Sequence, residues 1–248
     1  MQNIKLTIAY DGGDYLGWQK TSMGPSIEET LQEALERILR EKIVLQAASR
    51  TDAGVHAQGQ IVNFFTTKFI PSFDRFQYSL NSLLPPSIVV NNIENAAQSF
   101  HPTLDCVGKE YHYSICCGPI QLPQCRRYSW HYPYLLDVVA MQAGAQLLTG
   151  THDFSAFCNF KKNSDYPHFI RTVTDISIAQ SNDNRLLIKV SGNNFLYKMV
   201  RNIVGTLVYV GRGKFTLNEL RAILLNKDRK QAGVTAPACG LSLHRVFY

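Results

Sequence analysis

Arg50, Asp52 and His56 lie close together in the segment SRTDAGVHAQGQIVNFF, residues 49–65, between two apolar runs. A carboxylate near a guanidinium is kept ionised, and an ionised carboxylate can serve as a nucleophile or a general base. The same residues also permit a structural interpretation, because Asp and Gly are common in turns and an aspartate can close an Asx turn. Taken alone, the loop leaves both interpretations of Asp52 open.

His56 invites a role in metal binding or proton transfer. However, no second histidine or carboxylate stands at ligand spacing, and no zinc-site motif occurs in the chain. We therefore predict that His56 packs the loop and that the protein has no metal site. A glycosidase would need a second acid facing Asp52, and none adjoins it in the sequence.

The segment KEYHYSI, residues 109–115, places Tyr111 and Tyr113 on one face of a predicted strand. Two tyrosines at this spacing are typical of the aromatic platforms on which RNA-binding sheets stack bases. They are equally typical of an aromatic core, which is the interpretation we favour for Tyr113.

A predicted helix over residues 195–210 carries Arg201 and Gly205 on a face that differs from its apolar stripe. That stripe consists of Leu196, Val200, Ile203 and Leu207. Gly205 would allow another segment to approach the helix closely. An arginine in this place is usually a solvated charge, but it is also the partner that a partly buried aspartate needs.

The rest of the chain predicts two halves, each roughly β-α-β-β-α-β, which is the ferredoxin-like order. The boundary falls near residues 100–107. In the first half we predict strands over 4–10, 42–48, 60–67 and 87–96, and helices over 26–40 and 73–84. In the second we predict strands over 108–117, 171–180, 185–192 and 241–247, and helices over 137–150, 195–210 and 216–227. Capping boxes at Ser26–Glu29 and Thr216–Glu219 mark two helix starts.

The composition is that of a globular protein with a basic surface. Lys plus Arg number 25 against 19 Asp plus Glu, and the sequence pI is about 9.0. This surplus suits a polyanionic partner, with candidate phosphate contacts at Arg126–Arg127, Lys161–Lys162 and Lys227–Arg229–Lys230. Six scattered cysteines, no signal peptide and no apolar run long enough for a membrane helix indicate a cytoplasmic protein.

Several segments in series resemble the pseudouridine synthases that act on tRNA. They are YDGGDYLGWQ, SRTDAGVHAQGQ, KEYHYSI, GTHDFSAF, NNFLYKMVRNIVG, VGRGK and APACGLSLHRVFY. The resemblance covers nearly the whole chain, and RTDAGVHA is its most specific part.

The resemblance implies an α+β pseudouridine synthase fold, in which two ferredoxin-like halves share a central antiparallel sheet with a cleft between them. We assign residues 1–103 to the N-terminal half and 104–248 to the C-terminal half. It also implies a homodimer that modifies uridines 38, 39 and 40 in the tRNA anticodon stem-loop, without a metal or an organic cofactor.

By the same resemblance, Asp52 corresponds to the catalytic aspartate and Arg201 to its basic partner. Tyr111 corresponds to the tyrosine that packs on the target base, and Arg50 to an arginine that helps hold the flipped-out nucleotide. A non-catalytic tRNA-binding or tRNA-folding protein on the same fold is the alternative, and only the set around Asp52 separates the two.

The chain departs from the family pattern at two positions. It has Lys20 where the family often has Gln, and Asn194 where the family often has Gly. Lys20 could add a phosphate contact there. Asn194 is expected to keep the turn before the helix, because Asn tolerates positive φ best among non-glycine residues.

Overall fold

The computed structural model describes residues 1–159, 167–181 and 184–248, which form two compact units. Unit 1 comprises Met1–Val107 together with Ser242–Tyr248, and unit 2 comprises Gly108–Leu241. The sequence analysis placed the boundary at residue 103 and the last strand in the second half. That strand groups with unit 1 because Ser242 and Leu243 pair with His56 and Ala57.

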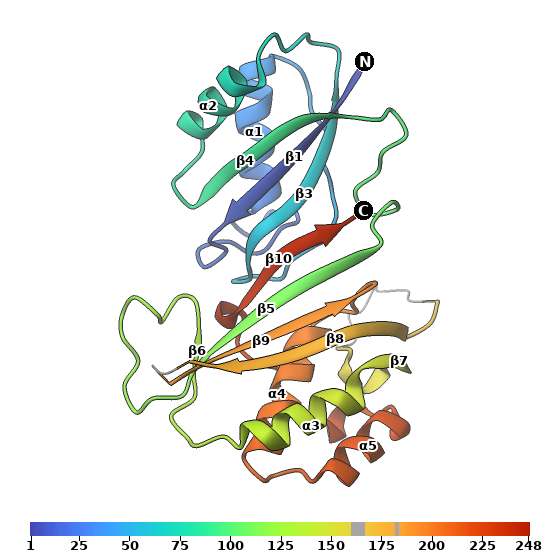
Figure 1. The fold of residues 1–248 in the computed structure, drawn as a ribbon. Coiled ribbons are helices and arrows are strands. Elements are labelled where there is room, and N and C mark those ends of the chain that lie inside the picture. Colours follow the sequence, from blue (N-terminus) through green and yellow to red (C-terminus); the bar gives the residue numbers. More distant parts are fainter. Residues whose placement is uncertain (160–166, 182–183) are drawn as a thin grey trace. The chain divides into compact units, whose positions relative to one another are not determined.

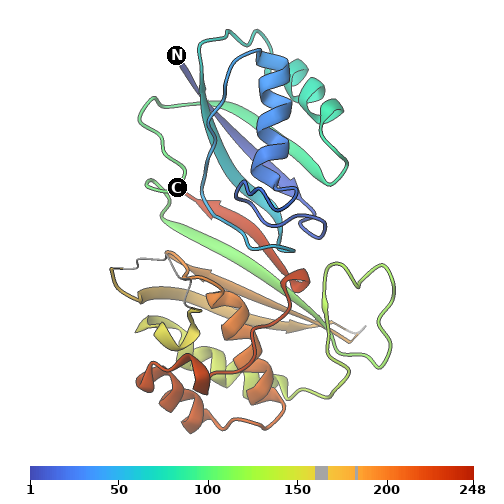
Figure 2. The same ribbon diagram turned by 180° about the vertical axis from the view of Figure 1, so that it is seen from behind.

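Unit 1 has the predicted order β-α-β-β-α-β, completed by the C-terminal strand. Its elements are β1 (Gln2–Tyr10), α1 (Ile27–Leu39), β2 (Gln46–Ala47), β3 (His56–Thr66), α2 (Phe73–Leu83), β4 (Ile88–Ala96) and β10 (Leu241–Phe247). The strand order is β4-β1-β3-β10, with β2 also paired to β3. Strands β4, β1 and β3 are antiparallel, whereas β10 runs parallel to β3. Both helices lie on one face of this sheet (Figures 1 and 2).

The core of unit 1 follows from the alternation that the sequence shows. Ile4, Leu6 and Ile8 of β1 are fully buried, and so are Leu31 and Leu35 of α1. Helix α1 begins after Ser26, whose side chain accepts the Glu29 backbone N–H. The Glu29 carboxylate pairs with Lys20 Nζ at 3.0 Å, and this partner raises the pKa of Lys20.

The predicted strand over 42–48 is wrong for most of its length. Ile43 and Leu45 are buried and Val44 is exposed, as the alternation suggested. However, the Ile43 N–H donates to the Glu36 carboxylate of α1 rather than to a neighbouring strand. Gln46 and Ala47 pair with β3, and the Ala48 N–H donates to the Ile61 carbonyl at 2.9 Å. The alternating burial of residues 43–45 therefore does not come from a hydrogen-bonded ladder.

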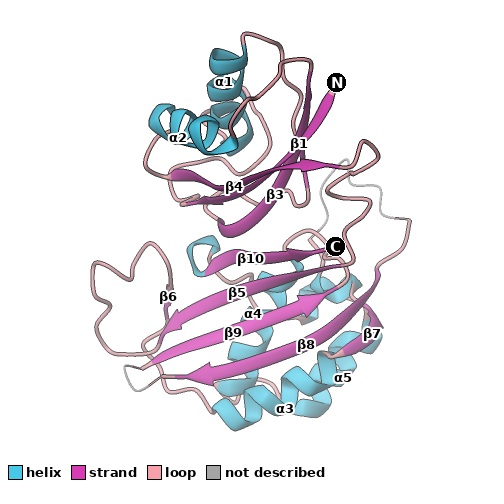
Figure 3. Cartoon of the chain, turned by 45° about the horizontal axis from the view of Figure 1, so that its top comes forward, coloured by secondary structure: helices cyan, strands magenta, loops and turns pink. Residues whose placement is uncertain are grey.

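Unit 2 is a mainly antiparallel sheet with helices on one face (Figure 3). Its strands are β5 (Gly108–Cys116), β6 (Trp130–His131), β7 (Gly150–Asp153), β8 (Ile170–Gln180) and β9 (Arg185–Gly192), and its α-helices are α3 (Val138–Leu148), α4 (Met199–Gly211) and α5 (Leu217–Asn226). The order is β5-β9-β8-β7, and β6 pairs in parallel with β5. Mixed strands and helices in both units confirm the α+β class.

Two short strands of unit 2, β6 and β7, were not predicted, whereas the β8–β9 hairpin was. Its strands pair as far as Gln180 and Leu186. Residues 182 and 183 of its predicted turn lie outside the described residues, as do Lys161 and Lys162. The capping box at Thr216 and Glu219 is complete in both directions and starts α5.

Helix α4 begins at Met199, four residues later than predicted. Lys198 adopts a left-handed conformation with φ of 60°, which a helix cannot continue through. Asn194 keeps the turn before this helix, as expected, although it is not among the residues with positive φ. Instead, its side-chain Oδ1 accepts the Phe195 N–H at 2.9 Å and holds the turn through a hydrogen bond.

The helices described in residues 1–159, 167–181 and 184–248 include none that is long and apolar enough to cross a membrane. All six cysteines lie in these ranges as free thiols.

Candidate active site

The Asp52 loop is a tight turn that begins at Asp52 itself. The Val55 N–H donates to the Asp52 carbonyl at 3.1 Å, and Gly54 has φ of +76°. A glycine with positive φ at the third position is what a type II turn requires. The turn chemistry and the catalytic interpretation are therefore compatible, because the turn uses the main chain of Asp52.

A second loop of unit 1, residues 11–18, packs against this turn through main-chain atoms. The Trp18 N–H donates to the Thr51 carbonyl at 3.0 Å. A Cβ atom added to Gly12 would lie 2.0 Å from the Val55 carbonyl oxygen, and one added to Gly17 would lie 2.7 Å from that of Thr51. Gly17 also has φ of +99°. Only glycines allow the two loops to approach this closely.

His56 packs this contact, as predicted. It is 6% exposed, and its Nδ1 lies 3.1 Å from Asp11 Oδ1 and 3.2 Å from the Gly12 nitrogen. The imidazole thus ties the start of β3 to the loop over residues 11–18.

The side chains of the Asp52 loop differ in exposure. Ser49 and Thr51 are buried, whereas Arg50 is exposed and Asp52 is partly exposed. The turn thus holds the main chain of Asp52 between buried neighbours, and the residue itself stays partly exposed. Both Asp52 and Arg50 lie in unit 1.

Tyr111 and Tyr113 lie on β5 of unit 2 in different surroundings. Tyr111 is 7% exposed, and its ring meets that of Phe195 edge-on at 5.2 Å. Tyr113 is fully buried and donates its hydroxyl proton to the Pro237 carbonyl at 2.8 Å. Burial raises the pKa of Tyr113. The prediction that Tyr113 belongs to the core is confirmed.

Arg201, also in unit 2, is held by the segment that follows α5. Its Nε donates to the Ala236 carbonyl at 2.7 Å, and the Ala236 N–H donates back to the Arg201 carbonyl at 3.1 Å. Gly205 permits this approach, since an added Cβ would lie 1.7 Å from the Val234 carbonyl oxygen. The predicted close contact at Gly205 is thereby confirmed.

Arg229, which is partly exposed, holds this segment through several hydrogen bonds of its guanidinium. Its Nη1 donates to the Gly233 carbonyl, and its Nη2 donates to Asn202 Oδ1 and Thr235 Oγ1, each at 2.9 Å. Burial lowers the pKa of Arg229. The expected basic cluster at 227–230 is thus reduced, because Lys227 also pairs with Asp153 at 2.9 Å.

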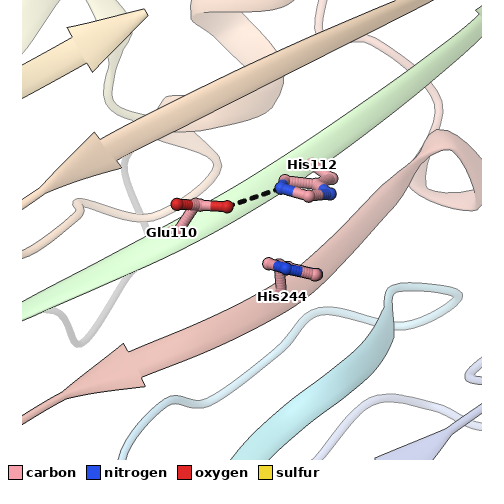
Figure 4. Close-up of side chains that lie close together, drawn as sticks. All are labelled: Glu110, His112 and His244. Carbon is pink, nitrogen blue, oxygen red and sulfur yellow. Dashed lines mark hydrogen bonds and ion pairs between the residues drawn. The ribbon is translucent and has the colours of Figure 1, made fainter.

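On the opposite face of β5, Glu110 and His112 lie next to each other. His112 Nε2 is 2.6 Å from Glu110 Oε1 (Figure 4). Figure 4 also draws His244 of β10, whose Nδ1 lies 2.8 Å from Gln58 Oε1 within unit 1. The sequence analysis assigned no function to these side chains.

Comparisons with known proteins indicate the family of the chain. The family model described as tRNA pseudouridine synthase matches residues 145–248. The chain is 58% identical to "tRNA pseudouridine synthase A 2" of Protochlamydia amoebophila, over 100% of this chain and 95% of that protein. It is 43% identical to "tRNA pseudouridine synthase A" of Thermoanaerobacter sp., over the full length of both.

A solved structure, "Crystal Structure of a Cbf5-Nop10-Gar1 Complex", is more distantly similar. It is 12% identical with a TM-score of 0.40, and the match covers 97% of this chain and 48% of the other. A similarity at this level supports no inference. The sequence identities over the full chain show that it belongs to the tRNA pseudouridine synthase A family.

The contact between the two loops of unit 1 can be tested at Gly12. Gly12→Ala would press a methyl group into the Val55 main chain, and relieving that overlap is expected to cost about 1–3 kcal/mol of unfolding free energy. Gly118→Ala is the matched control, because the nearest atom to its added Cβ is 3.6 Å away. Chemical denaturation measures both. Equal stabilities would contradict the close approach.

Proposed function

We propose that the protein isomerises uridine to pseudouridine at positions 38, 39 and 40 of the tRNA anticodon stem-loop. The observation that carries the proposal is the Asp52 turn, whose partly exposed carboxylate stands on a main chain held by a second loop. Membership of the family supports the same substrate and reaction. A non-catalytic tRNA-binding protein would have no need for a fixed carboxylate.

The reaction breaks the bond between N1 of uracil and C1′ of the ribose, turns the base and joins C5 to C1′. The hydrogen on C5 is lost to solvent, and N1 takes up a proton. The nucleotide must leave the helical stack, because neither C1′ nor the base can be reached inside it. An ionised Asp52 acts at the sugar, either by attacking C1′ or by taking a proton from C2′.

The other predicted residues take supporting roles in this proposal. Arg201 is the cationic partner that keeps Asp52 ionised. Tyr111 packs on the target base, and Arg50 helps hold the flipped-out nucleotide. The protein acts as a cytoplasmic homodimer and requires no metal or organic cofactor.

Release of the C5 hydrogen gives a direct test of Asp52. We expect tRNA labelled with tritium at uridine C5 to release its label to water with the pure protein, also in the presence of EDTA. Asp52→Asn keeps the size of the side chain but removes its charge, so it should bind tRNA and release no label. Asp74→Asn, an equal change at an exposed position of unit 1, should retain full release. Normal release by Asp52→Asn would refute the assignment.

Tyr111 and Tyr113 should respond differently to the same substitution. Loss of a stacking ring costs about 1–3 kcal/mol, so Tyr111→Leu should lose turnover while remaining folded and bound to tRNA. Tyr113→Leu removes a buried ring and its bond to Pro237, and should mainly lower Tm. Thermal unfolding and tritium release distinguish the two. The roles are reversed if Tyr111→Leu unfolds and Tyr113→Leu does not.

Binding of tRNA is expected to be largely electrostatic. Each phosphate contact on a duplex should add about 0.9 to the slope of log K against log salt concentration. Arg126 and Arg127 are exposed, so replacing both with Ala should lower the slope for all tRNAs alike. Arg221→Ala, on the exposed face of α5, is the comparison. Binding that does not respond to salt would contradict the polyanion interpretation.

A further inference from the structure

A buried hydrogen-bond chain lies directly behind the Asp52 turn. The Tyr10 hydroxyl is 2.7 Å from Thr51 Oγ1, and Gln60 Nε2 donates to the Tyr10 hydroxyl at 3.4 Å. Tyr10 is 4% exposed and Gln60 is fully buried. These hydrogen bonds therefore connect the last residue of β1 and an interior residue of β3 to Thr51, which immediately precedes Asp52.

The chemistry of the amide sets the direction of one of these bonds. Nε2 of a glutamine can only donate, so the phenol oxygen accepts from Gln60, whereas in the Tyr10–Thr51 bond either hydroxyl can be the donor. The same amide holds Ser49 at both of its backbone groups. Gln60 Oε1 accepts the Ser49 N–H at 3.2 Å, and Nε2 donates to the Ser49 carbonyl at 2.6 Å.

The strand geometry brings Tyr10 into this place. Ile8 pairs with Gln60, but Tyr10 pairs with Ala57, so the register shifts by one residue between them. Such a bulge redirects the side chains around it and is frequent beside active sites. Tyr10 consequently reaches the Thr51 side chain at the start of the turn.

We propose that Tyr10 is a positioning residue, whose hydroxyl fixes the orientation of the Asp52 turn for reaction through Thr51. The inference rests on the proposed function. Apolar packing could hold the turn in place, but a directed hydrogen bond also fixes its rotation. A misplacement of about 1 Å at a reacting group can lower a rate about 100-fold.

Tyr10→Phe removes the hydroxyl and keeps the ring. We expect kcat for tritium release to fall by about 10- to 100-fold, with KM for tRNA within about twofold of the wild type. Tyr248→Phe is the matched control. Its hydroxyl donates to the Pro102 carbonyl at 2.9 Å, and it lies in unit 1 outside both the Asp52 turn and the loop over residues 11–18. Both variants should lose a similar few degrees of Tm, but only Tyr10→Phe should lose kcat.

Substitutions of Thr51 test the same hydrogen bond independently if Tyr10→Phe does not fold. Thr51→Val keeps the shape and removes the hydroxyl, so it should lower kcat as Tyr10→Phe does. Thr51→Ser keeps the hydroxyl and should recover most of the rate.

The proposed function and the positioning role of Tyr10 would be contradicted by different results. If the wild-type protein releases no label, the proposed function is wrong. If the wild type is active and Tyr10→Phe matches Tyr248→Phe in kcat, or Thr51→Val matches Thr51→Ser, the positioning role is overturned.

Discussion

The close approach of two backbone segments around Asp52 is the constraint on which the candidate site depends. Gly12 and Gly17 bring the loop over residues 11–18 against the main chain of residues 51–55, at distances that no side chain would permit. The Asp52 turn is therefore held by main-chain contacts, and its carboxylate is left partly exposed. A group that must meet a substrate atom needs such support from outside its own side chain.

Unit 2 supports Arg201 by the same physical means. Gly205 allows the main chain of Val234 to approach closely, and the neighbouring Ala236 carbonyl accepts a hydrogen bond from the Arg201 guanidinium. Behind this contact, Asn202 is fully buried and accepts hydrogen bonds from Arg229 and Thr235. A buried polar network stabilises a structure only when its members are satisfied, and a satisfied network specifies one conformation. Each unit thus combines a glycine contact with a buried hydrogen-bond network.

Sequence patterns predicted the elements whose burial and backbone pairing coincide. The strands β1, β4, β5, β8 and β9 and the helices α1, α2, α3 and α5 lie where periodicity and capping placed them. The errors arose where the burial of a residue does not match the hydrogen bonding of its backbone. Residues 42–45 alternate in burial without a strand partner, and Lys198 delays α4 through its left-handed backbone. Asn194 holds its turn by a side-chain hydrogen bond, which a conformational preference does not reveal.

The sequence by itself determined the residue types of the candidate site and the family: an aspartate in a glycine turn, tyrosines on a strand, and a series of specific motifs. These depend on residue type and short spacing, which are local. Only the tertiary structure decided which distant groups support them. Tyr10 lies 41 positions from Thr51 and Arg229 lies 27 from Asn202, so no local pattern connects them. Arg229 looked like a phosphate contact for the same reason, because its hydrogen-bond partners are set by the folded chain and not by its neighbours in the sequence.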